Sequence, residues 1–241
     1  MGVRSAEPEL SIVVPVYNEE LSLPETLRRL KAYLDLKGRP WEVVVVSDGS
    51  VDRTDTIASE AAAADPRVRH IRLERNRGKG AAVRQGVRAS KGRYVLFTDA
   101  DLSAPIKESE KLLERLIAGA DVAVGSRALR SSGCDVRQTP KRYLAGRVFN
   151  VLVRSVLGLG IRDTQCGFKA FGRGAADRLF GAQTLEGFGF DVEVLYLARK
   201  YGMRVEEVPV MWSQGPRSRV RLWRDSVRMA ADLVRIRRLH G

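Results

Sequence analysis

Two aspartates, Asp99 and Asp101, are separated by one alanine and follow an apolar run at residues 94 to 98. Carboxylate oxygens are the ligands that hard divalent cations prefer, and such cations also bind substrate phosphates. An Asp-X-Asp sequence is usually an ordinary loop or helix-capping pair, because so short a motif often occurs by chance. At the end of a buried strand, the pair instead predicts a site for Mg²⁺ or Mn²⁺ bound to a diphosphate.

Asp48 is a third acid at the end of an apolar run, residues 41 to 47. A carboxylate there can accept a hydrogen bond from the imide N–H of a pyrimidine or from the amide edge of a purine. It can equally cap the helix that is expected to begin near Asp52. The residues alone leave both roles open.

Basic side chains that could neutralise phosphates occur in three short segments, NRGKG, GSR and VRQTPKR. Guanidinium groups bind phosphates through paired hydrogen bonds, and an ammonium binds them as a point charge. NRGKG does not fit the phosphate-loop pattern GxxxxGK[ST]. No GxGxxG follows the first apolar run, which argues against a dinucleotide-dependent oxidoreductase. The candidates are Lys79, Arg127, Arg137, Lys141 and Arg142.

The order of apolar and amphipathic segments predicts how these residues are positioned. Runs rich in Val and Ile are typical of strands buried on both faces, and they cover residues 11–17, 41–48, 68–73, 94–99 and 121–126. Helical patterns lie between them at residues 21–36, 52–64, 78–90 and 106–119. This alternation predicts an α/β fold with a mainly parallel central sheet flanked by helices. Ligands of such a fold bind beyond the carboxyl ends of the strands.

Length and composition favour one domain over residues 1–241. A chain with 44% hydrophobic residues can bury one sizeable core, and no repeat or linker marks a boundary. Beyond residue 130 the pattern is weaker. There we expect a helix at 143–160, a strand-like stretch at 163–171 and a helix at 191–202, as an elaboration on the sheet. The two cysteines indicate neither a disulfide framework nor a zinc site.

Six motifs resemble the inverting GT-A glycosyltransferases of family 2 and, within that family, the polyprenyl-phosphate sugar synthases. The motifs are SIVVPVYNEE, VVVSDGSVDRT, NRGKGAAVRQG, FTDADLSAP, VGSR and DTQCGFKAF, and the resemblance spans about residues 10 to 215. Each motif is weak alone, but six in the order of the family are unlike a chance agreement. The resemblance implies a GT-A fold, a nucleotide-sugar donor and a divalent metal, Mg²⁺ or Mn²⁺.

The resemblance also implies roles for individual residues. Asp99 and Asp101 would bind the metal on the diphosphate, with Lys79, Arg127 and Gln138 near the phosphates. Asp101 and Arg127 are therefore also expected to be catalytic. The nucleoside would be held by Pro15, Tyr17, Asn18, Glu19 and Asp48.

The same resemblance favours glucose as the sugar. DTQCGFKAF looks like the segment of the dolichyl-phosphate β-glucosyltransferases, which use UDP-glucose, whereas mannosyl enzymes usually carry a GFR-type segment there. Ser103 agrees, since mannosyl enzymes commonly have Gln two residues after the second Asp. We expect inverting transfer of glucose from UDP-glucose to a polyprenyl phosphate. The alternatives are GDP-mannose, another nucleotide sugar, or a soluble acceptor, because the configuration of one hydroxyl is read by side-chain placement.

Two further acids, Asp163 and Asp191, are candidates for positioning or proton transfer. Asp191 could instead cap the helix expected there, and Asp163 could end a loop. A phosphate monoester acceptor has a second pKa of about 6, so it is mostly dianionic at neutral pH and can react without a general base. The acceptor phosphate is expected to meet Arg142, Ser218 and Arg219.

The formal net charge of +13 indicates an anionic substrate or surface as partner. Helical spacing in the tail puts arginines on one face and Leu, Trp and Val on the other, which predicts a basic amphipathic helix at about residues 219–239. Such a helix suits peripheral contact with an anionic membrane, but a helix packed on a sheet is amphipathic too. We expect a cytoplasmic protein at the inner face of the cell membrane. Nucleic acid is not an expected partner, because aromatic residues make up 7% and form no stacking motif.

Overall fold

The computed structural model describes residues 7–129, 136–137, 150–213 and 222–241, and all structural statements concern these residues. All five strands expected in the first half are confirmed to within about a residue at each end. The strands are β1 Leu10–Val16, β2 Trp41–Ser47, β3 Val68–Arg72, β4 Tyr94–Thr98, β5 Val122–Ser126, β6 Val136–Arg137, β7 Phe168–Gly172, β8 Val205–Pro209 and β9 Trp212–Ser213.

The four helices expected between these strands are confirmed as well. The helices are α1 Leu23–Lys37, α2 Thr54–Ala64, α3 Lys79–Ala89, a short 3₁₀ turn η1 Ile106–Glu108, α4 Ser109–Ile117, α6 Arg173–Ala182, α7 Phe190–Lys200 and α8 Leu222–His240. Residues 150 to 157 are also helical, in the segment where the sequence predicts an apolar helix. No helix of the described residues is long and apolar enough to span a bilayer.

Seven strands form one sheet in the order β3-β2-β1-β4-β7-β5-β8, and β6 and β9 form a separate pair. β7 runs antiparallel to both of its neighbours, β4 and β5, while every other pair in the large sheet is parallel. The predicted fold class, an α/β fold with a mainly parallel sheet, is therefore confirmed. The carboxyl ends of the parallel strands and the first residue of β7 lie at the same edge.

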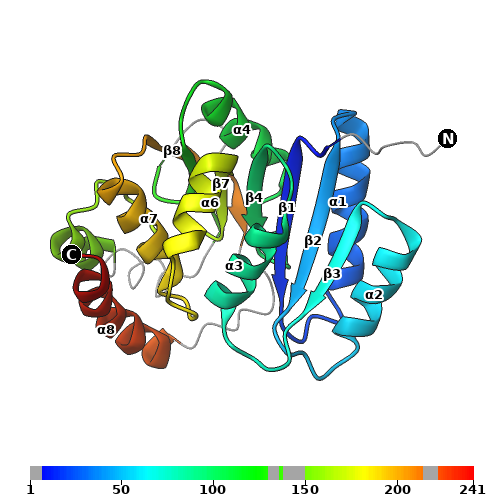
Figure 1. Cartoon of the computed structure of the whole chain (residues 1–241), viewed down its shortest axis with the longest axis horizontal. Helices are drawn as coiled ribbons and strands as arrows, with labels where there is room; N and C mark the ends of the chain where they lie inside the picture. The colour runs from blue at the N-terminus through cyan, green and yellow to red at the C-terminus, as the bar shows by residue number, and fades with distance from the viewer. Residues whose placement is uncertain (1–6, 130–135, 138–149, 214–221) are drawn as a thin grey trace.

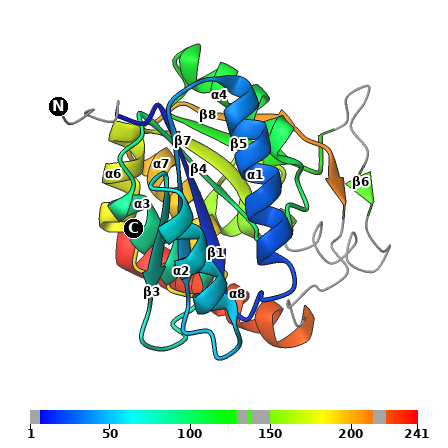
Figure 2. The ribbon, with the colours of Figure 1, turned by 90° about the vertical axis from the view of Figure 1, so that its right-hand side faces the viewer.

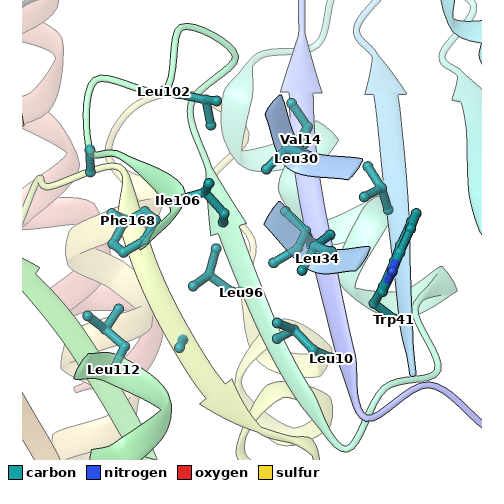
Figure 3. Close-up of a cluster of buried hydrophobic side chains, with 14 of the residues drawn as sticks. Leu10, Val14, Leu30, Leu34, Trp41, Leu96, Leu102, Ile106, Leu112 and Phe168 are labelled. Carbon is teal, nitrogen blue, oxygen red and sulfur yellow. The ribbon is translucent and has the colours of Figure 1, made fainter. Parts of the chain in front are cut away.

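Helices cover both faces of the sheet, as Figure 2 shows for α1 on one side and α3 and α6 on the other. Along β1, Ile12 and Val14 pack toward α1 and α4, while Val13 packs toward α3. This alternation is that of a strand buried on both faces. The cluster under α1 brings together Leu30, Leu34, Trp41, Leu96 and Phe168 among others (Figure 3).

The second half of the chain is part of the sheet rather than an elaboration on it. β7, the strand-like stretch of DTQCGFKAF, inserts between β4 and β5, and β8 extends the sheet beyond β5. In Figure 1, α6 and α7 follow on the same face as α3. The expectation was wrong here because a short apolar run does not reveal which strands it will pair with.

The helix expected at about 219–239 begins at Leu222 and ends at His240. From residue 229 on, its apolar side packs against the body of the protein, with Met229, Leu233 and Ile236 buried. Figures 1 and 2 place α8 toward the end of the molecule where β1, β2 and β3 terminate. The apolar face of α8 from residue 229 on is therefore part of the hydrophobic core.

Truncating Leu30 to Ala should lower the free energy of unfolding by about 2–5 kcal/mol, because the side chain is fully buried under the sheet. Leu36→Ala, on the same helix but 82% exposed, should change it by less than about 0.5 kcal/mol. Urea denaturation followed by circular dichroism measures both values. Equal losses in the two variants would contradict the packing of α1 described above.

Candidate active site

The loops that follow β1 and β2 are joined to each other by hydrogen bonds. The backbone N–H of Asn18 donates to Ser50 Oγ (3.0 Å), and Asn18 Oδ1 accepts from the N–H of Val51 (2.8 Å). The N–H of Glu19 donates to Thr54 Oγ1 (2.7 Å). These bonds hold Asn18 in a left-handed conformation with φ of 50°, which Asn tolerates better than most residues. The loop predicted to hold a nucleoside is thus fixed by the loop that carries Asp48.

The other residues of the first predicted loop lie nearby. Pro15 occupies β1 and is half-buried, and Tyr17 follows the strand with 36% of its side chain exposed. Glu19 begins the turn into α1, where its carboxylate accepts from the Ser22 hydroxyl. The roles of these residues toward a nucleoside stay predictions.

Asp48 is buried and ties the second loop to the segment before α3. Its Oδ1 accepts from the N–H of Arg77 (2.7 Å) and its Oδ2 from the N–H of Gly78 (2.8 Å). The alternative that Asp48 caps the helix beginning near Asp52 is wrong, because Asp52 itself accepts from the N–H of Thr54. Asp48 instead shapes the NRGKG segment, and its contact with a base stays a prediction.

The register of β7 against β4 puts Gly167 beside Asp99. Thr98 pairs with Phe168, so the residues just beyond the pair, Asp99 and Gly167, face each other at the edge of the sheet. A Cβ on Gly167 would overlap the carboxylate of Asp99. The DTQCGFKAF segment is therefore a wall of the site that contains the acidic pair.

Asp101 lies on the turn that leaves β4 and is exposed. Its Oδ1 accepts from the N–H of Ser103 (2.9 Å), and Leu102 between them has a φ of 47°. Ser103 is buried, and its carbonyl accepts from the N–H of Ser213 in β9 (2.9 Å). The turn is thus held from both sides while the Asp101 carboxylate faces solvent.

Lys79, the first residue of α3, reaches Asp99 of the acidic pair. Its ammonium lies 2.6 Å from Asp99 Oδ1, with 17% of the side chain exposed. Burial disfavours the ammonium, but Asp99 and, at longer range, Asp191 outweigh that cost, so the pKa of Lys79 is raised. The rings of Phe97 and Phe190 lie 5.8 and 6.0 Å from the ammonium. Lys79 therefore stays charged in this setting.

A second lysine, Lys169 of β7, is fully buried behind the first. Its ammonium donates to Asp191 Oδ1 (2.5 Å) at the start of α7 and to the Cys166 carbonyl (2.7 Å). Asp191 is 3% exposed. Asp191 was expected to act in positioning or proton transfer, or to cap the helix. In the structure its carboxylate neutralises a buried lysine, which favours a positioning role, and its part in catalysis stays a prediction.

Arg127 and Asp163 form a bidentate ion pair at the end of β5. Arg127 Nε and Nη2 donate to the two carboxylate oxygens of Asp163 at 2.7 and 2.8 Å, and the N–H of Arg127 donates to Oδ2 at 2.8 Å. Burial alone would raise the pKa of Asp163, but Arg127 more than offsets it and lowers that pKa. The guanidinium also lies over the ring of Trp212 at 5.3 Å. Asp163 therefore orients Arg127, and its catalytic role stays a prediction.

Some of the predicted contacts lie outside the described residues, namely Gln138, Lys141, Arg142, Ser218 and Arg219. Conversely, the structure adds residues that sequence reasoning missed as parts of the site. Gly167 and Lys169 stand in the quoted DTQCGFKAF segment, where a glycine directly before a strand could have indicated a close approach. Glu207 accepts from Ser126 Oγ and from the N–H of Asp163, both at 2.8 Å, and no pattern in the sequence marks it.

The acidic pair fits a divalent cation by its chemistry. Asp99 and Asp101 supply hard oxygen donors at the rim, with 39% of the Asp99 side chain exposed. Among the described residues, no three His, Cys, Asp or Glu side chains gather as a complete metal site. A cation held by two carboxylates takes its remaining ligands from phosphates and water, as Mg²⁺ commonly does. The donor set therefore suits a metal that arrives with a diphosphate.

Comparison with known proteins shows the family of the chain. A model of "Glycosyl transferase family 2" matches residues 11–180. Dolichyl-phosphate beta-glucosyltransferase of Drosophila melanogaster is 39% identical over 242 residues, which cover 95% of this chain and 74% of the relative. The Homo sapiens protein of the same name is 36% identical over 252 residues, covering 98% and 78%.

Solved structures show the same fold. Glucosyl-3-phosphoglycerate synthase from Mycobacterium tuberculosis, crystallised with Mn²⁺, uridine-diphosphate and phosphoglyceric acid, has a TM-score of 0.72. The match covers 98% of this chain and 79% of that one, at 20% identity. The fold, the edge at which the predicted residues gather and the family match lead to one conclusion: the chain is a glycosyltransferase that belongs to glycosyltransferase family 2.

Proposed function

We propose that the protein transfers glucose, with inversion, from UDP-glucose to a polyprenyl phosphate of the dolichyl type. The observation that carries this proposal is the contact between Gly167 and Asp99, because it makes DTQCGFKAF part of the acidic site. That segment is the one by which the sequence resembles glucosyl rather than mannosyl enzymes. The relatives named dolichyl-phosphate beta-glucosyltransferase, similar over almost the whole chain, support the same substrate class.

In the proposed donor complex, the loops after β1 and β2 hold uridine, and Asp48, which fixes the segment before α3, is proposed to contact the base as well. Asp99 and Asp101 would hold Mg²⁺ or Mn²⁺, which offsets the negative charge that builds on the departing UDP. Arg127, oriented by Asp163, and Lys79 add positive charge near the phosphates. Gln138 is proposed to contact the phosphates as well.

The acceptor phosphate does not require a general base to remove a proton. A phosphate monoester is mostly dianionic at neutral pH, since its second pKa is about 6. Both acids that could serve as a general base, Asp163 and Asp191, are buried and paired with cations. This pairing supports a mechanism in which the acceptor phosphate attacks C1 directly. Arg142, Ser218 and Arg219 are proposed to bind that phosphate.

A lipid acceptor requires the enzyme to work at a membrane, and we propose that α8 makes a peripheral contact at the inner face of the cell membrane. The helix carries exposed Arg235 and Arg238, and Val234 and Leu239 are each 50% exposed. Cationic side chains beside apolar ones favour an anionic lipid surface. The buried Leu233 shows that the helix also packs against the protein, so membrane contact is left to its other faces.

The proposal is tested by a matrix of UDP-glucose, UDP-galactose and GDP-mannose against a polyprenyl phosphate and against 3-phosphoglycerate. We expect transfer with UDP-glucose and the polyprenyl phosphate alone, lost on addition of a chelator. Product formation is followed by mass spectrometry of the glycolipid. Activity only with GDP-mannose, transfer only to 3-phosphoglycerate, or undiminished activity after chelation would each overturn the proposal.

Asp101→Ala should reduce metal-dependent transfer by roughly two to three orders of magnitude, because the charge stabilisation of the leaving diphosphate is lost. Asp177→Ala is the matched control, since Asp177 is an exposed acid on α6. It should retain wild-type activity. Initial rates at several Mn²⁺ concentrations give both results, and full activity of the Asp101 variant would exclude the metal site as proposed.

Gly167→Ala should lower kcat/KM by roughly tenfold to a hundredfold, because the added methyl group displaces the Asp99 carboxylate. Gly174→Ala has open space around the added methyl and should leave activity unchanged. Thermal melting separates loss of activity from loss of fold. A Gly167 variant with wild-type kinetics would show that the position of Asp99 does not depend on this contact.

A further inference from the structure

Asp99, which is proposed to bind the metal, already has a cationic side chain beside it. The ammonium of Lys79 lies 2.6 Å from Asp99 Oδ1, which is one of the two carboxylates proposed to bind the metal. A divalent ion on Asp99 would thus lie close to a like charge. Metal and lysine compete for the same oxygen donors.

The charges around Asp99 are already balanced in pairs. Lys79 faces Asp99, and behind them Lys169 faces Asp191 at 2.5 Å. Both ammonium groups lie near the ring of Phe97, at 5.8 and 5.5 Å, so little solvent separates the two pairs. With the exposed Asp101, the group carries one negative charge, so a bare dication would leave it positive. A dication together with a diphosphate would add almost no net charge.

The Lys79 ammonium can turn toward a bound diphosphate. Lys79 is the first residue of α3, where the positive end of the helix dipole favours an anion. Its long, flexible stem allows the ammonium to turn from Asp99 toward phosphate oxygens without movement of the helix. The helix start itself is fixed by the bonds from Asp48 to Arg77 and Gly78.

We propose that Lys79 is a resident counter-ion of Asp99 that excludes a free divalent metal and is drawn away by the donor diphosphate, so that metal and nucleotide bind as a coupled pair. This inference rests on the proposed nucleotide-sugar site. It makes Lys79 the residue that sets the coupling between the two ligands. By linkage, nucleotide strengthens metal binding by the same factor by which metal strengthens nucleotide binding.

Mn²⁺ binding in the absence of nucleotide tests the idea, with the electron paramagnetic resonance signal of free Mn²⁺ as the readout. Lys79→Met should lower the Kd for Mn²⁺ by at least about tenfold, because a like charge beside a dication costs that much even when solvent screens it. Lys79→Arg keeps the charge and should stay within about twofold of wild type. Lys79→Gln repeats the measurement if the Met variant does not fold.

Two further variants control for general effects of charge. Arg84→Met removes a cation from the same helix, where Arg84 pairs with Glu186 and the Gln183 carbonyl, and should leave the Mn²⁺ Kd unchanged. Asp99→Asn combined with Lys79→Met should abolish the gain in Mn²⁺ affinity.

The second measurement is UDP binding with and without Mn²⁺. The enhancement by Mn²⁺ should be smaller in the Lys79→Met protein than in wild type.

An unchanged Mn²⁺ Kd in folded Lys79→Met or Lys79→Gln protein overturns the inference, as does tight Mn²⁺ binding by the wild type alone. These results leave the proposed function standing if UDP-glucose is still turned over. Wild-type protein that binds no UDP in the presence of Mn²⁺ would instead refute the proposed function. The two failures are therefore distinguishable.

Discussion

The pairing of β7 with β4 and β5 fixes the relative positions of several polar groups in the site. Because Thr98 is opposite Phe168, Gly167 falls against Asp99, and Lys169 emerges in the middle of the sheet toward α7. The chain before β7 also carries Asp163 to the end of β5, where it meets Arg127. A slip of one residue in this register would move each side chain to the opposite face of the sheet. One antiparallel strand thus aligns three separate segments of the chain.

Ion pairs, rather than apolar contacts, form the inner wall of the site. Lys169, Asp191 and Asp163 are almost fully removed from solvent, and the Arg127 side chain is 23% exposed; burying such charges is costly unless each has a close partner and further hydrogen bonds. Both pairs meet that condition, since Lys169 also donates to a carbonyl and Asp163 also accepts from backbone N–H groups. Replacing one partner alone would leave a buried, unpaired charge. The pair with Asp163 therefore orients Arg127, and the pair with Asp191 holds Lys169 and the strand next to Asp99 in place.

Much of this arrangement could be predicted from the sequence, and the reasons for success and failure are physical. The apolar runs that end at Asp48, Asp99 and Arg127 predict parallel strands, and parallel strands bring their carboxyl ends together. The neighbours of each strand in the sheet could not be predicted, because the sequence DTQCGFKAF is equally typical of an edge strand and of a central strand. Asp191 and Asp163 could be recognised as acids near the site, but their cationic partners lie 22 and 36 residues away. Such separations carry no periodic signal.

The three ion pairs of the site also bear on how an anionic donor is captured. The chain has a net charge of +13, yet Lys79, Lys169 and Arg127, the cations described in the crevice, each face a carboxylate. Attraction at long range therefore comes from the outer surface, and in the proposed exchange Lys79 adds its charge at short range once it has turned from Asp99 toward the phosphates. Raising the ionic strength screens the first effect far more than the second. Salt should accordingly slow the arrival of the nucleotide sugar and leave its residence time nearly constant.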